Sequence, residues 1–254
     1  MGNSTPFVTL LRQEWFRFTR LWKQTIFPPI VTTVLFILIF GFSLGDRIRE
    51  IHGLSYILFI IPGLAAMGAM MNAHTNCSFA LYMSRFDQSI DNMLAAPLRS
   101  IELVTAFLWG GIARGMLVGL VTLAVSLLLL KQPPYHLGWT LFFLITQTVF
   151  FGCWGIVGAL RAKTWDNLAT AQNFIITPLI YLGGVFYSVD LLPGIWRTIS
   201  SFNPLLYMID GTRYGVLGVH DLSLLTSAGL SAGMALLMFA LCVILFQKGY
   251  RLVR

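Results

Sequence analysis

The sequence predicts an all-α integral membrane protein that forms a single transmembrane domain over residues 1–254. Hydrophobic residues make up 57% of the chain and charged residues only 11%, whereas soluble domains carry about 25% charged residues. Several apolar runs have the length of about 20 residues that a helix needs to cross a hydrocarbon core about 30 Å thick. The alternating pattern of an outer-membrane barrel is missing, so the spans are predicted to be helices.

Six runs are predicted to span the membrane, and the charges between them predict their orientation. The connections after the first, third and fifth runs contain five cations and five acidic residues, whereas the other side carries eleven cations. By the positive-inside rule, both termini are predicted to lie in the cytosol. The net charge of +7 then reflects topology and lipid contact, and nothing in it indicates nucleic acid as a partner. The predicted spans cover about 26–44, 54–78, 107–130, 138–160, 168–187 and 224–246.

Residues 5–24 are predicted to form an amphipathic helix before the first span. Thr5 is a suitable cap, and Pro6 suits the first turn. Aromatic side chains on one face and cations on the other are typical of a helix in the headgroup plane. A helix packed on its own protein shares this pattern, and the two interpretations can hold together. The apolar stripe contains Phe7, Val8, Leu11, Trp15, Phe18 and Trp22, and the opposite face contains Arg12, Arg17, Arg20 and Lys23.

Residues 84–100 connect the second and third spans on the predicted cytosolic side. Starting from Phe86, apolar residues recur at i, i+4, i+7 and i+8, which is the spacing of a short amphipathic helix. Pro97 disfavours helix at Ala96, and either Pro97 or Ser100 can start the next helix. The segment is therefore predicted to be helix, break, helix. A solvated connector is the alternative, and periodicity alone does not decide between the two.

The fifth span and the outer connection after it, residues 188–220, are interrupted by proline and glycine. Pro178 removes a backbone donor and Gly183–Gly184 loosens the helix, so a kink and an end near the outer face are predicted. The outer connection is cut into apolar pieces of about ten residues, a length that fits interfacial or re-entrant helices. Asn203 is a suitable cap and Pro204 a suitable first residue for the second piece. This connection is either a lid on an exit path or an aromatic anchor at the membrane surface.

Motifs of nucleotide hydrolysis and of hydrolytic catalysis are missing from the sequence. There is no Gly-x-x-x-x-Gly-Lys-Ser/Thr and no Gly-Lys pair, so the chain has no phosphate cradle of the Walker type. It also lacks His-Glu-x-x-His and Gly-x-Ser-x-Gly, and of its histidines only His74 falls in a predicted span. Cys77, Cys153 and Cys242 suit neither a metal site nor a disulfide framework and are predicted to be packed. No catalytic residue, metal ligand or bound cofactor is therefore predicted in this chain.

Four stretches, taken in order, resemble the ABC-2 family of ABC transporter permeases. They are the basic amphipathic start, "LAAPLRSIEL" between the second and third spans, "GGIARG" in the third span, and "TPLIYLGGVFYSVDLLPGIWRTISSFNPLLYMIDGTRYGVLG". The last stretch is the most specific, because its Pro, Gly-Gly and Asn-Pro punctuation follows the arrangement typical of the family. The chain is most similar to the bacterial inner-membrane group of YadH-like and NodJ-like permeases, and the resemblance covers essentially its whole length.

The resemblance implies partners and an architecture that composition does not reveal. Each permease of this family pairs with a second copy, and two separate ATPase subunits bind on the cytosolic side and hold ATP and Mg²⁺. The implied fold has six spans, an amphipathic connecting helix, a coupling helix between spans 2 and 3, and short re-entrant outer helices. The chain is accordingly expected to be a non-catalytic, multi-pass subunit of an exporter in the bacterial inner membrane.

The resemblance assigns an ATPase-coupling role to the connection at 84–100. A rigid lever is needed there to move with the ATPase and push spans 2 and 3, and a short amphipathic helix ended by proline suits that role. We expect Phe86 and Ile90 to plug a groove of the ATPase; the alternative is that they face lipid. The implied coupling residues are Arg85, Phe86, Asp87, Ile90, Asp91, Met93, Leu94, Pro97 and Arg99, with Ala96 behind them.

Polar residues in spans 2 and 5 are expected to line the route between two protomers. Polar groups in an apolar helix must face a partner helix or a cavity, and interhelical hydrogen bonding is the simpler role for any one of them. Arg114 must face protein or water or reach the headgroups, and is expected to be structural rather than a substrate contact. The expected route residues are Asn72, Thr75, Asn76, Gln172, Asn173, Thr177 and Tyr181, and the structural or gating residues are Arg114, Pro178, Gly183, Gly184, Asn203 and Pro204.

Two other classes of membrane protein also fit six spans with polar faces. A secondary transporter or channel would need inverted repeats or buried carboxylates for ion coupling, and the acidic residues all lie outside the predicted spans. A membrane anchor or assembly protein would stimulate no ATP turnover. The leading prediction is an ATP-driven exporter subunit whose cargo is a lipid, a glycolipid or polysaccharide, or an amphipathic drug.

Overall fold

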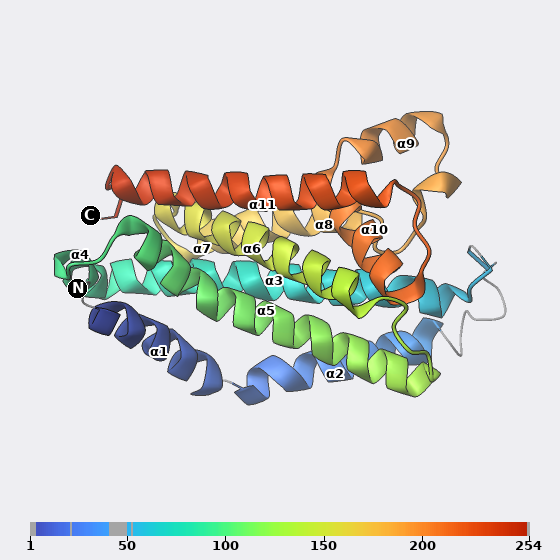
Figure 1. The fold of residues 1–254 in the computed structure, drawn as a ribbon, viewed down its shortest axis with the longest axis horizontal. Helices are drawn as coiled ribbons and strands as arrows, with labels where there is room; N and C mark the ends of the chain where they lie inside the picture. Colours follow the sequence, from blue (N-terminus) through green and yellow to red (C-terminus); the bar gives the residue numbers. More distant parts are fainter. Residues whose placement is uncertain (1–3, 21, 41–49, 52, 253–254) are drawn as a thin grey trace.

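The protein is an elongated bundle of helices (Figure 1). The start of α1, the short helix α4 and the end of α11 lie at one end of the bundle, which we call the α4 end. α9 and α10 lie toward the opposite end, which we call the α9 end. This computed structural model describes residues 4–20, 22–40, 50–51 and 53–252.

Within the described part of the chain, four helices are long and apolar enough to cross a membrane. The spans predicted at 138–160 and 224–246 agree with two of them to within one residue at each end. The other two are longer than predicted, because each continues past the apolar run to the α4 end. The four helices are α3 (Tyr56–Phe86), α5 (Ser100–Leu130), α6 (Leu137–Arg161) and α11 (Leu224–Gln247).

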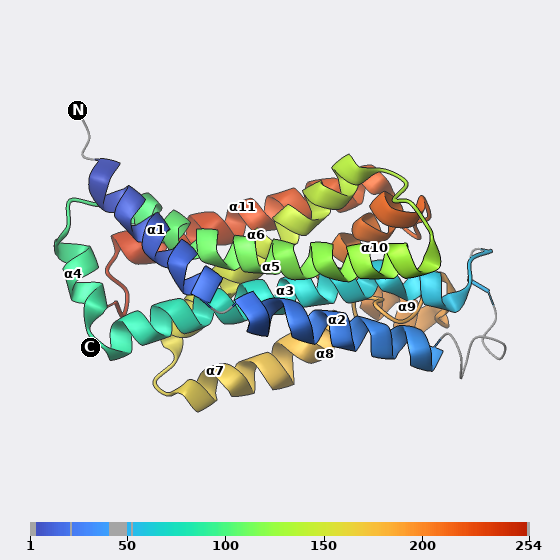
Figure 2. The ribbon, with the colours of Figure 1, turned by 90° about the horizontal axis from the view of Figure 1, so that it is seen from below.

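α3 lies at the centre of the bundle, between α5 and α6 (Figures 1 and 2). Small residues on α5 allow the close contact: a Cβ at Gly115 would lie 2.7 Å from the carbonyl oxygen of Ala69, and one at Gly111 would collide with Cys77 Sγ. On α6, a Cβ at Gly155 would collide with the carbonyl oxygen of His74. Small residues at helix interfaces are the usual means by which membrane helices approach one another.

The predicted helix at 5–24 is divided in two. α1 (Ser4–Arg20) ends before residue 21, and α2 (Trp22–Leu38) begins the next helix, so Trp22 belongs to α2. Leu10 packs against the core of the bundle, whereas Val8 and Trp15 stay exposed. α1 therefore has one face on its own protein and exposed apolar residues on another, so both interpretations of its amphipathic pattern apply. Outside the described residues lie the predicted cap side chain of Thr5, the side chain of Phe18, the end of the first predicted span at 41–44, and Asp46, Arg47 and Arg49.

α4 (Ser89–Ala95) connects α3 to α5 with the predicted order of helix, break, helix. Gln88 turns the chain with a positive φ of 61°, and Ala96 before Pro97 is extended, with φ −72° and ψ 149°. α5 then begins at Ser100, where the Glu102 carboxylate accepts a hydrogen bond of 2.7 Å from the backbone N–H of Arg99. The segment is therefore helix, break, helix, as predicted.

The fifth predicted span is a helical path made of α7 (Trp165–Ala171), the π-helical turn η2 (Gln172–Ile176) and α8 (Thr177–Tyr181). The π turn is followed by Thr177 and Pro178. Thr177 Oγ1 donates to the carbonyl oxygen of Gln172 at 3.0 Å, across this turn. The path ends six residues before the predicted limit of 187, because Gly184 turns the chain with a φ of +81°.

Three short helices form the connection to α11: η3 (Val189–Leu191), α9 (Gly194–Ser201) and α10 (Pro204–Leu217). α10 begins as predicted, because Asn203 Oδ1 accepts a hydrogen bond of 3.1 Å from the N–H of Leu205 and Pro204 is the first helical residue. α10 packs against α3, α6 and α11, whereas α9 lies apart from the long helices (Figure 1).

Candidate functional site

The apolar face of α4 is buried in the core of its own chain. Ile90 is 2% exposed, and both Ile90 and Met93 pack in a cluster with Leu81 and Leu103 from α3 and α5. The expectation that Ile90 reaches an ATPase groove is therefore wrong, as is a contact role for Met93. The helical spacing predicted the amphipathic helix correctly, but the partner of its apolar face is the bundle itself.

The opposite face of α4 and the turns around it are exposed. Phe86 belongs to the last turn of α3 and is 60% exposed, and Leu94 on α4 is 37% exposed. The carboxylate of Asp87 accepts a hydrogen bond of 3.0 Å from the N–H of Ser89, which fixes the turn into α4. Because α4 is anchored by its buried side chains, a force applied to its outer face acts directly on α3 and α5. The predicted coupling residues that are exposed here are Phe86, Asp87, Asp91, Leu94, Pro97 and Arg99.

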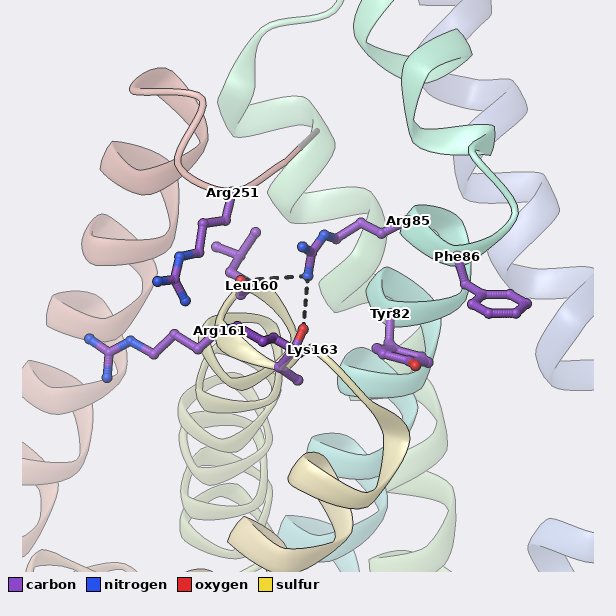
Figure 3. A pocket seen from close by; sticks show the side chains of 8 residues that line it. Tyr82, Arg85, Phe86, Leu160, Arg161, Lys163 and Arg251 are labelled. Atoms are coloured by element: carbon purple, nitrogen blue, oxygen red, sulfur yellow. Dashed lines mark hydrogen bonds between the residues drawn. The ribbon is translucent and has the colours of Figure 1, made fainter. Parts of the chain in front are cut away.

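Arg85 points away from that face and binds the end of α6 (Figure 3). Its Nη1 donates to the carbonyl oxygen of Ala159 at 2.6 Å, with longer contacts of 3.5 Å to the carbonyls of Leu160 and Ala162. The last carbonyls of a helix lack partners within the helix and carry the negative end of its dipole. Arg85 is therefore a structural bridge between α3 and α6.

A basic pocket of about 470 Å³ opens beside Arg85 at the α4 end. Figure 3 shows Arg161 and Arg251 on one side of Leu160, and Tyr82 and Phe86 on the other. Among the described residues, no aspartate or glutamate lines the pocket. We call this site the basic pocket; its lining residues are Tyr82, Arg85, Phe86, Leu160, Arg161, Ala162, Lys163 and Arg251.

The route residues predicted in spans 2 and 5 meet at one position. Thr75 Oγ1 donates to Gln172 Oε1 at 3.2 Å and to the carbonyl oxygen of Met71 at 2.8 Å, so it joins α3 to η2. Thr75 and Asn76 also line a cavity of about 200 Å³, which we call the polar cavity. The described residues that line it are Arg17, Thr25, Thr75, Asn76, Phe79, Arg114 and Trp165.

The other route residues do not converge on this cavity. The Asn72 amide donates to the carbonyl oxygen of Gly68 in its own helix at 3.0 Å. Thr177 Oγ1 likewise donates to a backbone carbonyl nearby in the sequence, that of Gln172. Asn173 and Tyr181 are exposed on the helical path of α7 to α8. Among the predicted route residues that the structure describes, Thr75 and Gln172 are the pair hydrogen-bonded to each other across two helices.

Arg114 and Arg17 bring positive charge to the polar cavity. Arg17 Nη2 donates to Asn76 Oδ1 at 3.0 Å and forms an ion pair of 2.5 Å with Glu14. Arg114 lines the cavity from α5, and its Nε is buried with no hydrogen-bond partner among the described residues. Arg114 therefore faces the polar cavity, which agrees with the expectation that it faces protein or water, and its structural role stays a prediction.

The buried carboxylate of Glu14 was not predicted from the sequence. It lies against Gly110 of α5, where a Cβ would be 2.9 Å from Glu14 Oε2. Burial raises the pKa of Glu14 to about 7, and the nearby Arg17 guanidinium opposes this shift. The glycine pair in "LWGGIA" indicates a close approach to α5, but nothing in it identifies Glu14 as the group that approaches.

The predicted structural residues near the α9 end lie at the junction of α8 and α10. Asn203 Nδ2 donates to the carbonyl oxygen of Leu179 at 2.8 Å, just after Pro178. A Cβ at Gly183 would lie 2.9 Å from Ile209 Cδ1, so the turn packs directly on α10. Arg213, which was not predicted, is 1% exposed and donates from Nη2 to the carbonyl oxygen of Gly184 at 2.6 Å. Its burial depends on partners far away in the sequence, which a local pattern does not reveal.

Comparisons with known proteins agree with this architecture. The family model described as ABC-2 type transporter matches residues 5–217. The chain is 38% identical over 237 residues to the inner membrane transport permease YadH of Escherichia coli (strain K12), with 93% of each chain covered. It is 24% identical over 218 residues to nodulation protein J of Rhizobium leguminosarum bv. trifolii, covering 85% of this chain and 83% of that protein. This chain therefore belongs to the ABC-2 type transporter family, as the membrane component of an ABC transport system whose ATPase is a separate subunit.

Proposed function

We propose that the chain is the permease subunit of an ATP-driven exporter in the bacterial inner membrane. Two copies would form the translocation path, and two separate ATPase subunits, which bind ATP and Mg²⁺, would power it. The observation that carries this proposal is the construction of α4. Ile90 anchors this short helix in the core, and Phe86, Asp91 and Leu94 are exposed around it. A helix anchored in this way is suited to transmit motion from a partner to α3 and α5.

We propose six spans with both termini in the cytosol, so that the α4 end is the cytosolic end. α2 and the path from α7 to α8 would supply the two spans beyond the four long helices. The apolar composition of Thr25–Leu38 supports this assignment for α2. The cations at the α4 end, which include Arg85, Arg161, Lys163 and Arg251, support the orientation. Similarity to the inner membrane transport permease YadH of Escherichia coli supports the inner membrane as the location.

The translocation path would follow α3 and the helical path from α7 to α8 at the contact between two protomers. The exposed amide of Asn173 and the polar cavity beside Thr75 support this placement. The hydrogen bond between Thr75 and Gln172 supports the simpler role of interhelical bonding for that pair. The cargo would be a lipid, a glycolipid or polysaccharide, or an amphipathic drug. Of the two roles for the outer connection, the anchor is favoured, since α9 exposes Ile195 and Trp196 and lies apart from the long helices.

Replacement of exposed apolar residues around α4 tests this function. The double variant Phe86→Asp, Leu94→Asp is expected to lose the ATPase subunit during co-purification. ATP hydrolysis in lipid nanodiscs should then fall to the rate of the ATPase alone, while the permease still elutes as a folded protein. Ile195→Asp, Ile199→Asp is the matched control, because it places the same charges on exposed apolar positions of α9.

The control variant is expected to retain the ATPase and its turnover. Retention of the ATPase by the α4 double variant would contradict the coupling role of this face. A wild-type chain that neither co-purifies with the ATPase nor changes its turnover would instead favour the alternative, a secondary transporter or channel without an ATPase partner.

A further inference from the structure

The basic pocket concentrates positive charge from Arg161, Lys163 and Arg251, which form no ion pair among the residues whose side chains the structure describes. Arg161, Lys163 and Arg251 line it, and all three side chains are exposed. The ion pairs between residues with described side chains, which are Glu14–Arg17, Asp190–Arg197 and Asp210–Arg213, do not involve them. Like charges held around one pocket repel each other, so an anion bound between them would be stabilised by all three.

The backbone around the pocket is held in place by hydrogen bonds and by core packing. Arg85 binds the carbonyl oxygens at the end of α6, and in doing so it opposes the negative end of the α6 dipole, which would otherwise repel an anion. Leu252 is 2% exposed and packs in the core, which anchors the backbone next to Arg251. The cations are therefore carried by an ordered framework that joins the ends of α3, α6 and α11.

An apolar surface begins at the same pocket. Phe79, Tyr82 and Phe86 lie at i, i+3 and i+7 on α3, which places them on one helix face. The rings of Tyr82 and Phe86 are 6.4 Å apart between centroids, and Trp165 of α7 lies 5.8 Å from Tyr82 and 5.3 Å from Phe79. These four rings form an aromatic row that leads from the basic pocket toward the middle of the bundle, and Phe79, Phe86 and Trp165 are exposed.

We propose that the basic pocket binds the phosphate group of an anionic phospholipid of the cytosolic leaflet, with an acyl chain along the aromatic row. The two guanidinium groups can bind phosphate oxygens with paired hydrogen bonds, and Lys163 adds a point charge. An acidic protein segment would satisfy the cations but would leave the aromatic row uncovered, so the combination favours a lipid. The inference rests on the proposed function for its orientation, which places the α4 end at the cytosolic leaflet.

Native mass spectrometry of the full-length permease, purified without its ATPase, tests the site. Dioleoyl phosphatidylglycerol is titrated in parallel with dioleoyl phosphatidylcholine and with glycerol 3-phosphate. The wild type is expected to retain phosphatidylglycerol in preference to phosphatidylcholine, whose choline group repels the cations. The triple variant Arg161→Gln, Lys163→Gln, Arg251→Gln should bind phosphatidylglycerol at least about tenfold more weakly, because each of the three removed cations attracts anionic lipid and a tenfold loss corresponds to only about 1.4 kcal/mol.

A second triple variant separates a specific site from general surface charge. Arg12→Gln, Arg20→Gln, Lys23→Gln removes the same charge from α1 and α2, outside the pocket. This control should weaken phosphatidylglycerol binding less than the pocket variant does, because the cations of α1 and α2 attract anionic lipid only as general surface charge. An equal loss in both triple variants would overturn the proposal. Competition by glycerol 3-phosphate would show that the pocket binds the phosphate group without acyl chains. Failure to compete would show that binding also needs the acyl chain along the aromatic row. Both results are compatible with the proposed site, since it contains both parts.

Wild-type phosphatidylglycerol binding by the pocket variant would also overturn the proposal. If that variant instead lost the ATPase, the pocket would be a docking site for an acidic segment of the partner. Because lipid binding is measured without the ATPase, a failure here is distinguishable from a failure of the proposed coupling function.

Discussion

Arg213 donates a hydrogen bond of 2.6 Å to the carbonyl oxygen of Gly184 in the interior of the protein, 29 residues away in the sequence. The same guanidinium lies 3.9 Å from the ring centroid of Phe59 and 3.4 Å from Asp210. Asp210 in turn accepts hydrogen bonds from the backbone N–H groups of Asp221 and Leu222, at 2.9 and 3.0 Å. One buried network therefore joins the turn after α8, the helix α10 and the loop that leads to α11.

Truncation of Arg213 is expected to destabilise the protein strongly. Arg213→Ala leaves the Asp210 carboxylate buried without its ion-pair partner, and breaking a buried pair in this way costs about 3–5 kcal/mol. Arg197→Ala is the matched control, because the Arg197–Asp190 pair of 2.7 Å is 57% and 42% exposed and such surface pairs contribute about 0–1 kcal/mol. Thermal unfolding in detergent should separate the two variants clearly. Equal stability of the two variants would show that the buried network contributes no more than a surface pair.

Glu14 is expected to make stability depend on pH. Its pKa of about 7 in the folded protein lies above its ordinary value of 4.5, because burial favours the protonated form. Between these values the folded state holds a proton that the unfolded state has released. The free energy of unfolding should therefore fall as the pH rises through this window, by up to about 1.4 kcal/mol per pH unit, and level off above about pH 7.

Comparison with a neutral side chain isolates the contribution of Glu14. Glu14→Gln should gain stability relative to the wild type as the pH rises from about 5 to about 7.5, measured by thermal unfolding at constant salt. Glu14→Met should show the same trend, because it also lacks the titrating proton. If both variants follow the pH profile of the wild type, another group is responsible for the dependence.

Elements with strong local signals could be predicted from the sequence, and those fixed by distant contacts could not. Proline and an asparagine cap placed the start of α10 at Asn203–Pro204, because capping depends on neighbouring residues only. Periodicity likewise predicted the α4 helix, but not that Ile90 faces its own core, since a pattern defines a face without naming its partner. The sequence marks Glu14 and Arg213 only as charged residues, because their buried contacts are with Gly110 and Gly184, far along the chain.

Gly111 is expected to be intolerant of even one added methyl group. A Cβ there collides with Cys77 Sγ at the contact of α5 with α3, so Gly111→Ala should destabilise the bundle by about 1–3 kcal/mol through overpacking. Gly229→Ala is the control on α11, where nothing lies within 4 Å of the added atom. That change should be neutral or stabilise by up to about 1 kcal/mol, because alanine favours helix. Thermal unfolding of the two variants provides the measurement, and a stable Gly111→Ala protein would indicate that α3 and α5 can move apart without loss.

Cysteine labelling is expected to distinguish a water-filled path from a surface that faces lipid. The native Cys77, Cys153 and Cys242 are buried, so they should react little with a membrane-impermeant, charged thiol reagent in nanodiscs. Asn173→Cys should react, since Asn173 is exposed on η2 beside the proposed path, and its rate should change when the partner ATPase binds ATP. Leu237→Cys on α11 is the critical control. Leu237 is also exposed, but α11 lies outside the proposed path, so we expect this position to face lipid, from which a charged reagent is excluded. Because both positions are accessible in the isolated chain, exposure alone predicts equal labelling and a water-filled path predicts selective labelling at 173.

Equally slow labelling at both positions throughout the ATP cycle would place α7 to α8 against lipid and remove this helical path from the proposed translocation route.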